Sequence, residues 1–150
     1  GDLGEPGQPA ADVNLHFLHP KANGDYFDAT YDCWEGNAMP EWGIFSSVDN
    51  PRLSFDDFDG AGPEQIYVEV PEQGMRYQVG VHYWKDWGFV LSVASVRVYV
   101  DGVLRDSWEH VELHNDDMWT THYIDWPSGT VTRIGSTAQI VPNFYRDHGM

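Results

Sequence analysis

At residues 96–103 the chain reads VRVYVDGV, alternating apolar and polar side chains up to an Asp-Gly pair. Asp101-Gly102 between two apolar runs is the strongest short-range signal of a β-hairpin, because both residues tolerate the positive φ angles of a two-residue turn. We therefore predict a strand that ends at Val100 and a second strand that pairs back from Val103 to Leu113.

The same alternation recurs on both sides of this hairpin. A period of two indicates half-buried strands whose apolar side chains all face one way. Turn residues recur about every ten positions, and no segment shows a sustained helical period, so we predict an antiparallel β-sandwich of about seven or eight short strands. The side chains expected to point inward are Val13, Leu15, Phe17, Ile66, Val68, Val79, Val81, Val96, Val98 and Val100.

The two ends of the chain differ from this pattern. Residues 1–11 contain three Gly and two Pro with almost no apolar side chain, a composition typical of a flexible linker. We expect the sandwich to occupy residues 12–136 and residues 137–150 to form a loosely held C-terminal tail. The chain has no initiator Met or signal-peptide pattern, and we expect a fragment of a longer protein.

The charge balance narrows the range of partners. The chain carries 24 acidic and 8 basic residues, a formal net charge of −16. Such a field repels nucleic acids and anionic lipids, which proteins bind through Lys and Arg. No apolar run approaches the roughly 18–20 residues of a membrane-spanning helix. Strong acidity is compatible with solubility outside the cell, with cation binding or with a basic partner.

Acidic residues are most concentrated in LSFDDFDGAGPE, residues 53–64, where Asp56, Asp57 and Asp59 occupy three of four positions. These carboxylates repel one another unless a cation neutralises them. Calcium takes six to eight oxygen ligands, and glycines allow a backbone to present several oxygens to one point. A transition metal is less favoured, because no His or Cys adjoins the cluster. The alternative interpretation is a solvated acidic turn on an already acidic protein.

Three segments together resemble a family of bacterial exported β-sandwich domains, the YfaP-like domains, similar in style to pre-peptidase C-terminal domains. These segments are residues 12–20, residues 53–64 and Gly80-Val81-His82-Tyr83, within a match that covers roughly residues 12–105. The ending Gly60-Ala61-Gly62-Pro63-Glu64 carries the family pattern intact. Asn14 and Ser54 stand where the family tends to have Asp, so each replaces a charged oxygen with a neutral one.

The resemblance implies a secreted, periplasmic or cell-surface location and no enzymatic activity. We expect a non-catalytic accessory module whose partner, a protein or a glycan, the sequence does not identify. The resemblance and the acidic segment together predict one Ca²⁺ held by the carboxylates of Asp56, Asp57 and Asp59. Asn14 and Glu64 are expected as further oxygen ligands, with loop carbonyls completing the shell.

An alternative function is a carbohydrate-binding module. The chain has seven Trp residues. This number exceeds what the core of a small domain usually contains. Trp84 falls on the polar face of its predicted strand, whereas Trp42 and Trp87 lie in irregular segments. Partly exposed aromatic rings beside polar groups stack sugars or anchor protein partners. The competing interpretation is that these rings close the ends of the sandwich.

Other chemistry has weaker support in the sequence. The seven His lack a zinc-binding spacing, and His16 and His19 would lie on opposite faces of a strand. We interpret the His as surface residues or as core residues with hydrogen-bond partners. No nucleophile-elbow motif is present. The single Cys33 excludes an internal disulfide and indicates no particular compartment.

Overall fold

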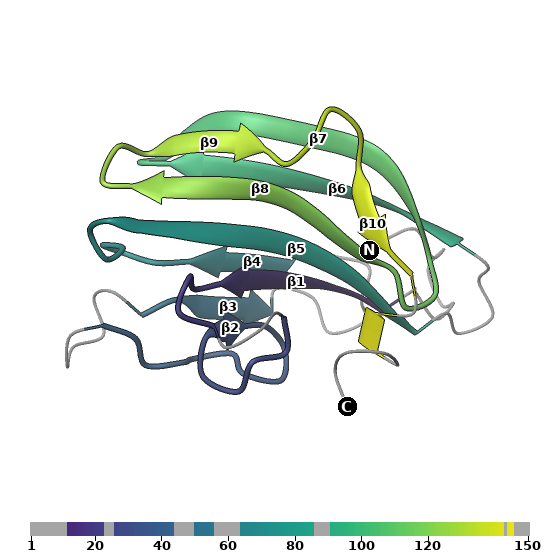
Figure 1. Ribbon diagram of the computed structural model, residues 1–150, viewed down its shortest axis with the longest axis horizontal. Helices are drawn as coiled ribbons and strands as arrows, with labels where there is room; N and C mark the ends of the chain where they lie inside the picture. The colour runs from purple at the N-terminus through teal and green to yellow at the C-terminus, as the bar shows by residue number, and fades with distance from the viewer. Residues whose placement is uncertain are drawn as a thin grey trace.

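The computed structural model describes residues 12–22, 26–43, 50–55, 64–85, 91–142 and 144–145. Every named element is a β-strand, every strand pairing is antiparallel, and the predicted all-β class is confirmed. No helix among the described residues is long and apolar enough to span a membrane. The strands (Figure 1) are β1 (Asp12–Leu18), β2 (Asp32–Cys33), β3 (Arg52–Phe55), β4 (Glu64–Tyr67), β5 (Met75–Lys85), β6 (Leu91–Val100), β7 (Val103–His114), β8 (Met118–Trp126), β9 (Thr130–Arg133) and β10 (Gln139–Val141).

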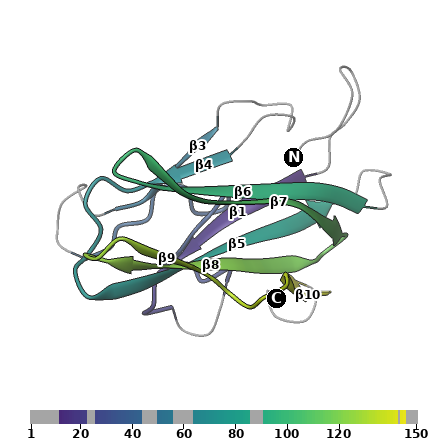
Figure 2. The same ribbon diagram turned by 90° about the horizontal axis from the view of Figure 1, so that it is seen from above.

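One layer of the fold is a six-stranded sheet in the order β10-β8-β5-β1-β2, with β9 also paired to β8. Because β9 pairs with residues 122–125 and β10 with residues 118–120, these two strands follow one another along the same edge of β8. The second layer consists of two separate hairpins, β3–β4 and β6–β7. Both hairpins lie on the same side of the large sheet (Figures 1 and 2).

The main hydrophobic core fills the space between the two layers. Val79 and Val81 of β5 contribute to it from the large sheet, and Val96 and Val98 contribute from β6. Of the side chains predicted to point inward, all except that of Val13, which lies outside the described set, are buried or packed against this core. The alternating sequence pattern therefore identified the inner face of both layers.

The hairpin at residues 96–103 forms as predicted. Val100 and Val103 are partners across the β6–β7 ladder, and Asp101 and Gly102 have φ angles of 52° and 77°. Both signs are positive, as a two-residue hairpin turn of the primed type requires.

Two segments differ from the sequence-based expectation. Residues 26–34 are rich in Tyr, Phe, Thr and Trp, a composition typical of a strand, but they contribute only the two residues of β2. Residues 137–150 were expected to be a loose tail, yet residues 139–141 form β10 and Phe144 is only 3% exposed. The reason is that Ile140 packs against the main core and Phe144 packs in a second cluster with Met118.

The large sheet is covered on both faces. Its second face carries Gln78, Gly80 and His82 of β5, and residues from the segment after β1 lie over it. The ring of Tyr26 rests on Gly80, and its hydroxyl accepts a hydrogen bond of 2.7 Å from Gln78 Nε2. Polar side chains that alternate with the core residues are consequently buried instead of facing solvent.

Candidate functional site

The acidic segment connects the two strands of the β3–β4 hairpin. Leu53 pairs with Ile66, and the ladder ends at Phe55, which pairs with Glu64. Directly opposed residues of an antiparallel ladder have Cα atoms about 4.5–5.5 Å apart. Asp56, Asp57 and Asp59 lie outside the described residues, as does the side chain of Glu64, but the chain enters and leaves this segment at neighbouring points.

Asn14 lies on β1, which is in contact with β4 of this hairpin. On β1 it alternates with Leu15, which packs toward the main core, and its own side chain is 1% exposed on the other face of the sheet. The β3–β4 hairpin lies on the core side, where Leu53 and Ile66 pack. Because Asp56, Asp57 and Asp59 lie outside the described residues, the expected role of Asn14 as a further calcium ligand stays a prediction.

Of the three Trp predicted to bind sugars, the structure describes the side chain of Trp42 alone. Trp42 is 2% exposed, stacks on Phe17 and Tyr77, and donates its indole N–H to the Thr30 carbonyl oxygen. Its ring closes the end of the core, and it offers no face for a sugar in this structure. Only the backbone of Trp84 is described, on β5, and Trp87 lies outside the described residues.

The covered face of the large sheet holds a buried polar layer, which we define as His16, Asp32, His82 and Asp116. Asp32 Oδ2 accepts hydrogen bonds from His16 Nδ1 at 2.6 Å and from the backbone N–H of Phe27 at 2.7 Å. His16 and Asp32 are both 0% exposed, and Trp34 stacks on the His16 ring at 5.1 Å between centroids. The Asp32 carboxylate thus joins β1, β2 and the covering segment.

Phe27 occupies a strained position within this layer. Its φ angle is 69°, a region that bulky side chains rarely adopt and that costs about 1–3 kcal/mol. The bond to Asp32 and ring contacts with His16 and Trp34 hold it there. Such strain persists only where the surroundings over-determine the conformation, so Phe27 depends on the polar layer beneath it.

The second pair of the layer links β5 to the β7–β8 connection. His82 Nε2 donates to Asp116 Oδ1 at 2.7 Å, and the side chain of His82 is 1% exposed. Burial lowers the pKa of His82 to about 4, although the hydrogen bond to Asp116 acts in the opposite direction. His82 is therefore a neutral imidazole at pH 7 that donates one hydrogen bond to a carboxylate.

Four buried His in the described part of the chain share this pattern. Besides the two pairs above, His19 Nε2 donates to Glu72 and His122 Nε2 donates to Asp106, both at 2.7 Å. A buried imidazole needs a partner for its N–H, and each of these four has a carboxylate. The interpretation of these four His as core residues with hydrogen-bond partners is thus correct, although in His16 the second ring nitrogen, Nε2, is buried without one. Within the described residues no group of three His, Cys, Asp or Glu side chains is arranged to hold a metal ion.

One of these pairs has the connectivity of a hydrolytic triad. Thr121 Oγ1 lies 2.8 Å from His122 Nδ1, and His122 Nε2 is bonded to Asp106. The order hydroxyl–imidazole–carboxylate is the one that activates a nucleophile. However, Thr121 and His122 are both 0% exposed, so no substrate can reach the hydroxyl here. The arrangement instead joins β8 to the β6–β7 hairpin.

Asp106 extends this connection to β9. Arg133 donates to it from Nε at 2.7 Å and from a terminal nitrogen at 3.2 Å, and its guanidinium lies over the Trp108 ring. The hydrogen bond from Arg133, aided by that from His122, lowers the pKa of Asp106 to about 2. Because this pKa lies below the ordinary range of Asp, the pair stabilises the fold above about pH 4 and loses its effect as the pH falls toward 2.

We expect Asp106→Asn to lower the free energy of unfolding at pH 7 by about 1–2 kcal/mol, since Asp106 is partly exposed and screened by solvent. The difference between variant and wild type should shrink as the pH falls from 4 to 2. Urea unfolding across that range measures both effects. Asp125→Asn, which alters the more exposed Arg76–Asp125 pair, is the control, and an equal loss in the two variants at pH 7 would contradict the prediction.

Comparisons with protein families, with curated proteins and with solved structures find no match to this chain.

The buried polar layer is the feature that sequence reasoning missed. Its signal was present in the polar residues Asn14, His16 and His82, which alternate with core residues on β1 and β5.

Cys33 is a free, buried thiol. Burial raises the pKa of this thiol to about 12, so Cys33 is a poor nucleophile.

Proposed function

We propose that this chain is a non-catalytic calcium-binding β-sandwich module, an accessory domain of a larger exported bacterial protein. The proposed ion lies at the β3–β4 hairpin and is bound by the carboxylates of Asp56, Asp57 and Asp59, with Asn14, Glu64 and loop carbonyls as further ligands. The YfaP-like sequence pattern supports the exported location and the accessory role, and both remain proposals.

One structural observation supports this proposal most directly. The Phe55–Glu64 pair closes the ends of the acidic segment onto each other. Within such a closed connection, eight residues must accommodate three carboxylates at short range. A divalent cation removes that repulsion, and calcium accepts the irregular set of oxygens that a short loop supplies.

Calcium binding should therefore stabilise the whole domain. A ligand that binds only the folded state adds RT ln(1 + [L]/Kd), which is about 2.7 kcal/mol at a hundredfold excess over Kd. For a domain of this size we expect the melting temperature in millimolar calcium to exceed that in EDTA by roughly 5–10 °C. Calorimetric titration with CaCl₂ should show a single site per chain.

Two variants separate a specific site from a general charge effect. Asp59→Ala should abolish the calcium-dependent rise in melting temperature, because it removes one proposed ligand. Glu112→Gln removes one exposed carboxylate from β7 and should leave the rise intact. Superimposable wild-type curves in EDTA and in calcium would show that the acidic segment is only a solvated turn.

A further inference from the structure

One ring nitrogen of the buried polar layer takes no part in hydrogen bonding. His19 and His122 have hydrogen bonds at both ring nitrogens. His16 differs, because Nδ1 bonds Asp32 whereas Nε2 is buried with no partner among the described residues. Asp32 Oδ1 is likewise buried without one. In proteins such an atom usually binds an ordered water or an ion.

The Nε2 atom of His16 is directed toward β5. Asp32 belongs to β2, and β1 lies between β2 and β5 in the large sheet. The two nitrogens of an imidazole point away from each other across the ring. A ring that bonds Asp32 through Nδ1 therefore directs Nε2 to the opposite side. His82 of β5 is the neighbouring imidazole on that side, with 6.2 Å between the ring centroids and 87° between the ring planes.

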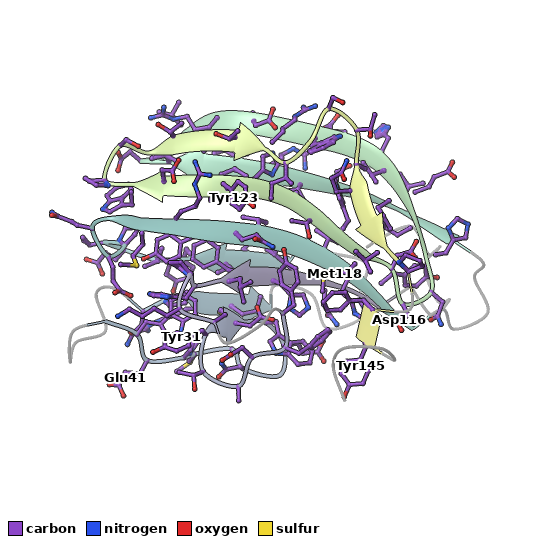
Figure 3. The ribbon with its side chains drawn as sticks, in the orientation of Figure 1. Tyr31, Glu41, Asp116, Met118, Tyr123 and Tyr145 are labelled. Atoms are coloured by element: carbon purple, nitrogen blue, oxygen red, sulfur yellow. The ribbon has the colours of Figure 1, made fainter. Side chains whose placement is uncertain are left out.

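His82 has the mirror-image arrangement. Its Nε2 donates to Asp116 Oδ1 at 2.7 Å, so Nδ1 lies on the side of the ring away from Asp116. A backbone amide fixes each carboxylate: Phe27 N–H donates to Asp32, and Tyr145 N–H donates to Asp116. Figure 3 shows Asp116 and Tyr145 at the same end of the molecule. A metal-binding His almost always donates its other N–H to such a carboxylate, which fixes the tautomer and the ring orientation.

The distance between the two rings suits one metal ion in line with both. An imidazole nitrogen lies about 1.1 Å from its ring centroid and about 2.0 Å from a bound metal, so two rings on opposite sides of an ion have centroids about 6.2 Å apart. The observed separation of 6.2 Å between His16 and His82 matches this arrangement. A tetrahedral angle at the ion would bring the centroids to about 5 Å. The rings therefore favour near-linear coordination by two ligands.

We propose that the polar layer binds one Cu⁺ ion between His16 Nε2 and His82 Nδ1. Imidazole is a ligand that copper accepts, and Cu⁺, a closed-shell ion, is stable with two ligands in line. Zn²⁺ prefers four ligands in a tetrahedron, and the described residues contain no group of three His, Cys, Asp or Glu that could hold a metal. The ion also offsets the buried charge of Asp32, whose only ion-pair partner among the described residues is His16.

The proposed site is structural. Both imidazoles are buried, so the ion has no open position for a substrate, and it links β1 to β5 beneath the covering segment. Calcium prefers oxygen ligands, so this site and the calcium site at the β3–β4 hairpin do not depend on each other. Asp59→Ala should accordingly leave the copper content unchanged.

Copper content tests the proposal in the full chain. Protein incubated anaerobically with Cu⁺ in the presence of CaCl₂ and then desalted should retain one copper per chain. The same treatment with Zn²⁺ should leave about tenfold less metal bound, because four tetrahedral ligands are not at hand. A protein that retains no copper, or that retains both metals equally, would overturn the proposal.

Nuclear magnetic resonance of the histidine rings locates the ion in the unmodified protein. Because Cu⁺ is diamagnetic, the ring nitrogen signals stay observable. We expect binding to shift the signals of His16 Nε2 and His82 Nδ1 and to leave both nitrogens of His122 unchanged. His110 and His114 are exposed, and shifts confined to them would show adventitious surface binding and contradict the proposal.

Substitutions give an independent test. His16→Gln and His82→Gln each remove one proposed ligand, and each should lose the retained copper. His122→Gln is the matched control, since it removes a buried imidazole whose two nitrogens are already bonded. Cys33→Ser removes the free thiol, another soft ligand. Both controls should retain one copper. Copper loss in either control, or copper retention in both ligand variants, refutes the site. Should a ligand variant fail to fold, the ring signals of the unmodified protein decide alone.

Discussion

Asp32→Ala is expected to destabilise this protein by about 3–5 kcal/mol, the range found when one partner of a buried ion pair or hydrogen-bonded pair is removed. The Asp32 carboxylate is 0% exposed and satisfies both His16 Nδ1 and the N–H of Phe27. Its loss leaves two buried donors without an acceptor and removes the bond that holds Phe27 at a positive φ angle.

Urea or thermal unfolding at pH 7 measures this loss, which corresponds to a fall in melting temperature of about 10 °C or more. Asp125→Ala is a matched control, because it removes an acid paired to Arg76 at the surface, where an ion pair contributes only about 0–1 kcal/mol. Asp32→Asn, which keeps an oxygen acceptor, should fall between the two. A loss below 1 kcal/mol in Asp32→Ala would show that the polar layer does not stabilise the fold.

Gly80→Ala should cost about 2–4 kcal/mol, the second largest effect expected. A Cβ atom at position 80 would lie 2.6–2.7 Å from two ring carbons and the hydroxyl oxygen of Tyr26, closer than real Cβ atoms approach other atoms. Tyr26 must then move, which costs about 1–3 kcal/mol in overpacking. Moving it also disturbs the hydrogen bond between its hydroxyl and Gln78.

A double-mutant cycle isolates this contact. If the clash with Tyr26 is the cause, Gly80→Ala should cost little in a Tyr26→Ala background, giving a coupling energy of about 2 kcal/mol. Gly74→Ala is the control for backbone conformation, since its Cβ meets no atom within 4 Å but its φ angle is +78°; it should cost about 1–2 kcal/mol. Additive losses at positions 26 and 80 would refute the clash.

The sequence predicted the strands well where a local signal was complete. The Asp101-Gly102 turn and the alternating residues of β5 and β6 each carry their own evidence for structure. The prediction was less successful for β10 and for Phe144, because a short apolar segment becomes ordered only when a partner is in place to receive it. In this chain the partners are β8 and Asp116, which lie about twenty residues and more upstream.

The candidate sites divide in a similar way. The acidic segment could be recognised from residues 53–64 alone, because crowded carboxylates are a local property of the chain. The polar layer could not, since it joins His16, Asp32, His82 and Asp116 from four separate segments. Seen singly, each of these residues is an ordinary polar position on a strand or in a turn.

The sequence by itself determined the fold class, the hairpin at residues 96–103 and the inward-facing residues of each layer, because period-two alternation and turn chemistry act over a few residues. The tertiary structure decided which polar residues are buried. Tyr26, Phe27 and Phe144 cover the second face of the large sheet, and once that face is covered, every polar group on it needs a partner from elsewhere in the chain. Pairing of that kind depends on distances in space, which a linear sequence does not contain.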